Sequence, residues 1–216
     1  MAYDKVVDSA VLDAGLTSIA DAIRTKGGTT ATMSFPDGMA SAITAIPTGG
    51  GGSDELITFI KGVIDRTTTA TQFPSELSGI TSIGDYAFAF CPSLALTSLP
   101  SGVTSLGTCA FRSCFKMVLT SLPSGLTTIA MYAFDSCKSL ALTSIPSSVT
   151  SIGYSAFSNC VALKTLTFEG TPKSIESNAF SNCSNLKTIN VPWASGAVSG
   201  APWGATNATI NYNYTA

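Results

Sequence analysis

A 23-residue period runs through residues 74–192 and constrains the fold more than any other feature of the chain. Five Ala-Phe pairs recur at this spacing, and a cysteine follows each phenylalanine by three residues. The columns are Phe88, Phe111, Phe134, Phe157 and Phe180, and Cys91, Cys114, Cys137, Cys160 and Cys183. One such unit is too small to bury its own apolar face, whereas stacked units share a continuous core. The period therefore predicts a solenoid.

Each unit also contains a short run of apolar and polar residues before a turn, as in Leu96–Leu99 and Leu142–Ile145. These runs predict one short β-strand per coil, ending near the proline that follows. A short helical or 3₁₀ segment is expected to carry the Ala-Phe pair inward. In the fourth unit, residues 169–172 (Glu-Gly-Thr-Pro) replace the simple proline turn, which predicts a bulged loop there.

The pattern Ile-Gly-x-x-Ala-Phe-x-x-Cys-x-x-Leu, followed by Ile-Pro, resembles the BspA-like, or Treponema-type, leucine-rich repeat. The resemblance covers residues 74–192, which is more than half of the chain. It implies an α/β solenoid of 23-residue coils with a parallel β-sheet. It also implies roles in surface recognition and adhesion rather than in catalysis.

Residues 1–47 carry a different pattern, typical of a small α-helical module. Apolar residues recur at steps of three and four in two stretches, separated by Gly27-Gly28 and Phe35-Pro36. They are Leu12, Leu16, Ile19 and Ile23 in the first stretch, and Met39, Ile43 and Ile46 in the second. A module of this size is too small to be very stable alone, so we expect it to anchor the protein and to form a homo-oligomer, with a trimer as the working guess.

The remaining segments are expected to connect and close the solenoid. Residues 48–53 are rich in glycine and predict a flexible linker. Residues 54–73 are expected to form the N-terminal cap, with a helix over Asp54–Arg66 and a strand over Thr67–Gln72. Residues 193–216 are expected to form the C-terminal cap, because the open ends of a solenoid need covering.

Both flanks also resemble segments of bacteriophage and prophage tail or fibre proteins. The N-terminal pattern is Leu-Thr-Ser-Ile-Ala-Asp-Ala-Ile-Arg-x-Lys-x-Gly followed by Phe-Pro-Asp-Gly, and the C-terminal pattern runs from Val191 to Tyr212. This resemblance implies a virion structural protein, assembled in the bacterial cytoplasm and joined to other virion proteins through residues 1–47. It would display the repeat to a bacterial surface glycan or protein. A bacterial cell-surface adhesin and a cytosolic protein-binding scaffold remain as alternatives.

Two groups of residues are candidates for ligand binding. If the strands alternate strictly, three leucines point outward as an exposed stripe; if a bulge turns them inward, the adjacent threonines are exposed instead. The second group is aromatic and either stacks on a ligand or forms a hydrophobic end cap. The leucines are Leu96, Leu119 and Leu142, and the aromatic residues are Trp193, Trp203, Tyr212 and Tyr214.

Composition excludes several classes of function. The chain has no histidine, which removes histidine-based catalysis and metal binding. The chain has 11 basic and 13 acidic residues, and the basic residues do not cluster, so nucleic-acid binding is not expected. The acidic residues show no repeated pairing suited to acid–base chemistry, so we expect neither an enzyme nor a cofactor.

The sequence also bears on the membrane and on the cysteines. No run of 18 apolar residues occurs, so no membrane insertion is expected. The start of the chain lacks the apolar core of a secretory signal, which predicts folding in a cytosol. All six cysteines are expected to be reduced core thiols rather than disulfides or metal ligands, because side chains in a parallel ladder point the same way.

Overall fold

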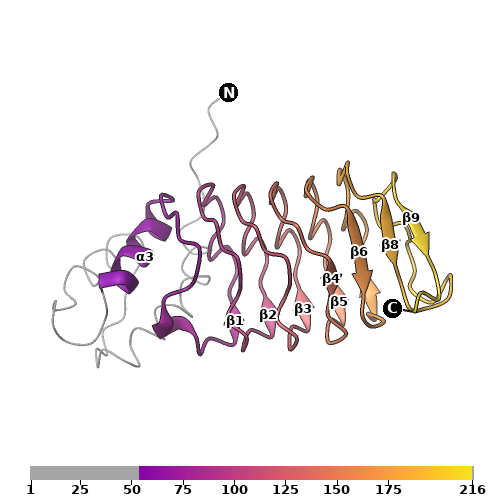
Figure 1. Ribbon diagram of the computed structural model, residues 1–216, viewed down its shortest axis with the longest axis horizontal. Helices are drawn as coiled ribbons and strands as arrows, with labels where there is room; N and C mark the ends of the chain where they lie inside the picture. The colour runs from indigo at the N-terminus through magenta and orange to yellow at the C-terminus, as the bar shows by residue number, and fades with distance from the viewer. Residues whose placement is uncertain (1–53, 216) are drawn as a thin grey trace.

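The computed structural model describes residues 54–215, which form an elongated solenoid of about 6 coils (Figure 1). Helix α3 (Asp54–Ile64) lies at one end and strand β9 (Thr209–Asn211) at the other, with successive coils side by side between them. A 3₁₀ helix, η1 (Ser75–Leu77), follows α3. The predicted solenoid with 23-residue coils is confirmed. The helical module predicted for residues 1–47 and the linker at 48–53 lie outside the described residues.

A five-stranded parallel sheet runs along one side of the solenoid. Each strand has two residues, a half-buried Ser or Thr followed by a buried Ile or Leu, so the alternation places one side chain in the core. Paired residues are 23 positions apart, as for Ser82 and Ser105. The strands, in sheet order, are β1 (Ser82–Ile83), β2 (Ser105–Leu106), β3 (Thr128–Ile129), β5 (Ser151–Ile152) and β7 (Ser174–Ile175).

A second parallel sheet occupies the C-terminal half of the solenoid, where the strands lie before the turn (Figure 1). Its strands are β4 (Ser144–Ile145), β6 (Thr165–Phe168), β8 (Thr188–Asn190) and β9. The prediction of one strand per coil is therefore wrong in detail. Leu96–Leu99 is not a strand, although Thr97 N–H donates to the Thr71 carbonyl at 2.9 Å. The five-stranded sheet lies after the turn, where no strand was predicted.

The Ala-Phe pairs form the centre of the core. The five phenylalanine rings are buried and stack nearly parallel from coil to coil, with centroids 5.2–5.6 Å apart and interplanar angles of 4–12°. Each aromatic pair adds about 0.5–1.5 kcal/mol beyond the burial of its area. The inward direction predicted for these phenylalanines is confirmed.

The segment that carries each pair is a series of tight turns, not the predicted helical segment. In the first coil, Ala87 N–H donates to Gly84 and Ala89 N–H to Tyr86, each spanning three residues. Tyr86 and Phe90 have positive φ angles of 57° and 60°, and the equivalent positions of the next four coils do too. In each turn, two residues with positive φ angles prevent the backbone from continuing as a right-handed helix. The chain therefore changes direction at the turn.

Helix α3 covers the N-terminal end of the solenoid. Phe59 of α3 contacts Phe73 and Phe88, with ring centroids at 5.6 and 5.9 Å. The helix was predicted to reach Arg66 but ends at Ile64, because Arg66 is left-handed with φ 60°. The strand predicted over Thr67–Gln72 is absent, although two carbonyls of this segment accept hydrogen bonds from the first coil.

The loop of the fourth unit does not bulge. The strand pairs on either side of it keep the 23-residue offset, since Ile145 pairs with Phe168 and Ile152 with Ile175. Gly170 allows this close fit, because a Cβ at this position would lie 2.7 Å from the Cα of Ser147 in the preceding coil. The predicted bulge is wrong because glycine accommodates the change in sequence.

Candidate functional site

The three leucines predicted as an exposed stripe lie inside the core. Leu96, Leu119 and Leu142 are 0%, 0% and 2% exposed, and the next inward column three residues later is buried as well. The adjacent threonines, Thr97, Thr120 and Thr143, are exposed instead. The exposed stripe is therefore wrong and the inward alternative is confirmed. The segment does not follow strict strand alternation, so residues three apart both point inward.

The C-terminal aromatic residues divide between the core and the surface. Trp193 and Trp203 are 6% and 1% exposed, pack against Phe168, and form the hydrophobic end of the solenoid, so they do not present a ligand-binding face. Tyr212 is half-buried against the core, and Tyr214 is 39% exposed. The end-cap alternative accounts for the two tryptophans. Binding through Tyr212 or Tyr214 stays a prediction.

The residues predicted for anchoring and oligomerisation lie outside the described residues. They are Leu12, Leu16, Ile19, Ile23, Met39, Ile43 and Ile46.

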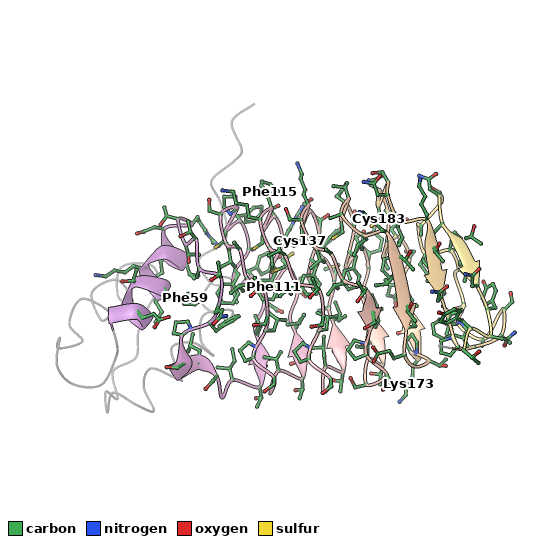
Figure 2. The ribbon with its side chains drawn as sticks, in the orientation of Figure 1. Phe59, Phe111, Phe115, Cys137, Lys173 and Cys183 are labelled. Carbon is green, nitrogen blue, oxygen red and sulfur yellow. The ribbon has the colours of Figure 1, made fainter. Side chains whose placement is uncertain are left out.

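The five-cysteine column forms a ladder of thiols inside the solenoid (Figure 2). All six cysteines of the chain are free, as predicted. In four coils, the thiol donates to the carbonyl of the preceding coil's phenylalanine at 3.0–3.1 Å, as Cys137 does to Phe111. Burial raises the pKa of the Cys183 thiol to about 12 and raises those of Cys114, Cys137 and Cys160 well above their ordinary value. These thiols are protonated structural donors, not nucleophiles.

A cluster of exposed and half-buried side chains lies on the turns that carry the Ala-Phe pairs. We call it the aromatic–arginine patch. Its members come from four successive coils, and three of them are 37–43% exposed despite being large and apolar. The patch comprises Phe90, Arg112, Met131, Tyr132 and Tyr154.

Arg112 lies at the centre of this patch. Its guanidinium carbon is 5.8 Å from the ring centroid of Phe90 and 5.2 Å from that of Tyr132, so two aromatic rings hold it by cation–π contacts. Tyr132 makes an edge-to-face contact with Tyr154 at 5.6 Å. The Asn178 side chain then donates to the Tyr154 hydroxyl at 3.3 Å. Contacts between side chains thus connect five coils on the surface.

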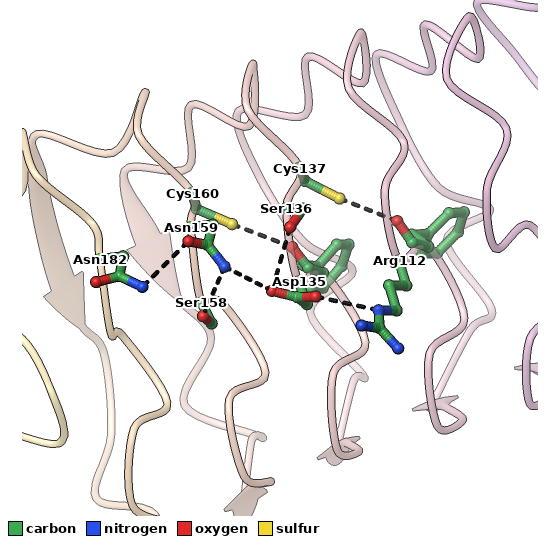
Figure 3. A network of polar contacts seen from close by, with 10 residues as sticks. Arg112, Asp135, Ser136, Cys137, Ser158, Asn159, Cys160 and Asn182 are labelled. Carbon is green, nitrogen blue, oxygen red and sulfur yellow. Dashed lines mark hydrogen bonds and ion pairs between the residues drawn. The ribbon is translucent and has the colours of Figure 1, made fainter. Parts of the chain in front are cut away.

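A chain of polar side chains continues from Arg112 along the solenoid (Figure 3). We call Asp135, Asn159 and Asn182 the polar chain. Arg112 Nε donates to Asp135 Oδ2 at 3.1 Å, Asn159 Nδ2 donates to Asp135 Oδ1 at 3.0 Å, and Asn182 Nδ2 donates to Asn159 Oδ1 at 3.2 Å. Asp135 is 6% exposed, and a third donor, the Ser136 hydroxyl at 3.3 Å, completes its partners. A buried carboxylate is costly without such partners.

The sequence interpretation missed these residues. In the sequence, Asp135 is one of several acidic residues that show no repeated pairing. The signal lay in the 23-residue columns on either side of the phenylalanines, where the residue type changes from coil to coil. One such column contains Ala89, Arg112, Asp135, Ser158 and Ser181. A column that varies in chemistry while its neighbours stay apolar indicates a position near the surface of the repeat, although Ala89, Asp135 and Ser158 in this column are themselves buried.

Two further observations concern metal binding and membrane insertion in the described residues. Within residues 54–215, no group of three potential metal ligands comes together. No helix in that part of the chain is long and apolar enough to cross a membrane.

The family model for the BspA type leucine rich repeat region matches residues 67–195 in 6 copies. This match spans more than half of the chain, and the protein belongs to that family. A search of the curated proteins found no match. The family resemblance predicted from the repeat is confirmed, whereas the resemblance of the flanks to phage proteins stays a prediction.

Several bacterial leucine-rich repeat proteins of known structure are similar to this chain. The T. pallidum protein is 32% identical, with a TM-score of 0.52, over 66% of this chain and 68% of that protein. A protein from Bacteroides ovatus is 28% identical, with a TM-score of 0.42, over 51% of this chain and 35% of that protein. A protein from Eubacterium ventriosum is 27% identical, with a TM-score of 0.49, over 61% of this chain and 36% of that protein. The chain thus spans only about a third of the latter two proteins.

Proposed function

We propose that the protein is a recognition protein whose rigid solenoid presents the aromatic–arginine patch to a ligand on a bacterial surface. The observation that carries this proposal is the patch itself. Large apolar side chains are normally scattered singly on a protein surface, whereas here they gather around an arginine on adjacent coils. Tyr, Phe, Met and Arg are the residue types enriched in the cores of binding surfaces.

Rigidity supports a binding role. The patch stands on turns joined by backbone hydrogen bonds between coils, such as Cys109 N–H to the Met131 carbonyl at 2.9 Å and Tyr132 N–H to the Tyr154 carbonyl at 3.0 Å. Side chains on such a scaffold lose little freedom when a ligand binds. The family is typical of binding scaffolds rather than enzymes.

We further propose a bacteriophage virion as the setting. The resemblance of both flanks to tail and fibre proteins supports it. Residues 1–47 would attach the protein to other virion proteins as an oligomer, and the linker at 48–53 would let the solenoid reach outward. Several copies on one particle would strengthen weak individual contacts through avidity.

A bacterial cell-surface adhesin is the second candidate. The similarity to the T. pallidum leucine-rich repeat protein favours it, because that relative is a bacterial protein with the same repeat. In that case, the aromatic–arginine patch would contact a surface outside the cell that produces the protein.

Immunogold electron microscopy distinguishes the two settings. Antibody against the full chain is applied to induced phage particles and to cells of the same strain. Gold on a tail or capsid supports the virion proposal, and gold on cell envelopes with bare particles supports the adhesin. Deletion of residues 1–47 is the second test: the protein should stay folded but no longer join particles.

The binding role itself is tested with purified full-length protein on a panel of bacterial cells. We expect binding to at least one strain, reduced about tenfold or more by Phe90→Ala. If no cell binds the wild-type protein, the recognition proposal is wrong.

A further inference from the structure

We infer that the aromatic–arginine patch and the polar chain form one elongated site for a neutral glycan chain that lies along the solenoid axis. This inference rests on the proposed recognition function and adds the position of the site and the chemical class of its ligand. It depends on the spacing of the rings, the orientation of the polar groups and the balance of charge.

The aromatic rings of the patch come from the first, third and fourth coils, and the Tyr132 and Tyr154 rings are nearly perpendicular, at 86°. Stacked phenylalanines in the core set the step of the coils at 5.2–5.6 Å, and the Tyr132 and Tyr154 rings on the surface are 5.6 Å apart. An extended glycan advances by one sugar ring over a similar distance. The C–H faces of sugar rings pack against aromatic faces, whose amphipathic character suits a ligand that is apolar on one face and polar at its edge. A sugar unit can therefore pack on the face of one ring, while the ring of the next coil contacts its neighbour through an edge.

The polar groups are held in place before any ligand arrives. Asp135 accepts a hydrogen bond from Nε of Arg112 at 3.1 Å, and the Arg112 side chain remains 39% exposed. Asn182 is exposed, and its carbonyl oxygen accepts no hydrogen bond within the described part of the chain. Amides and guanidinium groups offer the donors and acceptors that sugar hydroxyls pair with. Fixed side chains give such pairs at a small entropic cost.

The repeat does not require these polar residues. The position of Asp135 is occupied by alanine in the first coil and by serine in the last two, and the backbone follows the same turn in each. A carboxylate that is 6% exposed is costly to bury and needs several partners. The fold alone therefore does not account for this network. The side chains of Arg112 and Asn182, at its two ends, are accessible to solvent.

The charge balance favours a neutral ligand. Arg112 and Asp135 neutralise each other at 3.1 Å, so the centre of the site has no excess charge to select a polyanion or a polycation. Asp85 lies near Tyr86 at the first coil of the same face, where its charge contributes to the raised pKa of that hydroxyl, after the larger effects of the Cys109 thiol and of burial. The chain as a whole has a net charge of only −2.

The shape of the surface favours a glycan over a folded protein. A stable protein interface buries about 800 Å² on each partner, with an apolar core inside a polar rim. Here the exposed apolar side chains Phe90, Met131 and Tyr154 come from the first, third and fourth coils. The polar chain runs over the third to fifth coils, so the two overlap along the axis. Rings and amides thus occur together over successive coils, an arrangement that fits an extended polymer lying along the axis.

The test uses bacterial cells that bind the full-length protein. The cells are treated either with periodate, which cleaves sugar diols, or with proteinase K, and binding is measured at about 50 mM and about 500 mM NaCl. We expect periodate to abolish binding, whereas protease treatment and added salt leave it within about twofold. Tyr154→Ala and Asn182→Ala should each weaken binding about tenfold or more.

Phe115→Ala is the matched control, because Phe115 is as exposed as Tyr154, at 39% against 37%, and its ring contacts Lys138 rather than a residue of the patch. Its binding should equal that of the wild type. Circular dichroism spectra and melting temperatures establish that each variant is folded.

The outcomes separate this inference from the proposed function. Protease-sensitive, periodate-resistant binding that the patch variants reduce leaves the recognition function standing but overturns the glycan. Strong loss of binding in high salt overturns the neutral ligand. Equal losses in Tyr154→Ala and Phe115→Ala overturn the position of the site. Absence of any cell binding rejects the recognition function itself.

Discussion

At the scale of single residues, two side chains in each coil carry most of the organisation. The phenylalanine stacks on its neighbours, and the cysteine three positions later donates to the phenylalanine carbonyl of the coil before. The first contact fixes the spacing of the coils. The second adds a thiol hydrogen bond to a buried carbonyl that already accepts from a backbone N–H of its own turn, as Phe111 does from Cys114. Two columns that looked merely apolar in the sequence therefore play different roles.

Replacing a stacked phenylalanine should cost a large part of the stability. Phe134 is fully buried between Phe111 and Phe157, at 5.6 and 5.3 Å. Phe134→Ala leaves a cavity and removes both ring contacts, so we expect a loss of about 3–5 kcal/mol in the free energy of unfolding, measured by urea denaturation. Phe115→Ala is the control: this ring is 39% exposed and should cost less than about 1 kcal/mol. Similar losses for both variants would contradict the stacked core.

The thiol ladder should make stability fall in alkaline solution. Burial raises the pKa of these thiols in the folded protein, to about 12 for Cys183, against 9.0 for an unperturbed thiol. As pH rises above about 9, the unfolded chain releases thiol protons that the folded chain retains, so each thiol lowers stability by about 1.4 kcal/mol per pH unit. The effect is absent below the unfolded pKa.

Urea denaturation in a reducing buffer between about pH 7 and about pH 11 measures this slope. Cys183→Ala should make the decline shallower by the contribution of one thiol. If Cys183→Ala has the same slope as the wild type, the Cys183 thiol has the same pKa in the folded and the unfolded protein, and the prediction is wrong.

At the scale of elements, the turns decide how closely coils approach. A Cβ at Gly153 would lie 2.5 Å from the Met131 nitrogen and 2.7 Å from the Ala130 carbonyl carbon in the preceding coil. Backbone atoms cannot move aside as a flexible side chain can. The glycine therefore permits the spacing that brings Met131 and Tyr154 onto one face.

Gly153→Ala should lower the free energy of unfolding by about 1–3 kcal/mol because of this crowding. Gly79→Ala is the control, since a Cβ there meets nothing within 4 Å. Thermal melts of the two variants provide the comparison, and equal melting temperatures would refute close contact between the coils at this turn. Cell binding by Gly153→Ala should fall as well, because displaced backbone separates the rings of the patch.

The sequence alone predicted the core columns well and the strands poorly. Burial forces the same residue type into the same register, so the positions of Phe111 and Cys137 follow from the period. A two-residue strand such as Ser105–Leu106 is too short for alternation to reveal it. The patch was beyond reach because its residues depend on where left-handed turns direct them, and positive φ at Tyr86 or Tyr132 leaves no reliable mark in the sequence.

At the scale of the whole molecule, the solenoid is a rod whose coils contact only their neighbours (Figure 1). Stability in such a rod is a sum of the coils and their interfaces, so damage at one end spreads over a limited distance. Trp203 closes the C-terminal end: it is 1% exposed, and its indole donates to the Ser199 carbonyl at 2.7 Å. Trp193 packs beside it at 6.3 Å between ring centroids.

Trp203→Ala should therefore loosen the last coils and leave the first ones intact. Loss of a buried tryptophan costs about 3 kcal/mol or more, which corresponds to about a hundredfold faster amide exchange where opening is local. We expect this acceleration in hydrogen-exchange mass spectrometry for peptides around Phe180 and no change around Phe88. Tyr214→Ala should alter neither region. Uniform acceleration along the chain would mean that the solenoid unfolds as one unit, in which case binding at the patch would also depend on the distant cap.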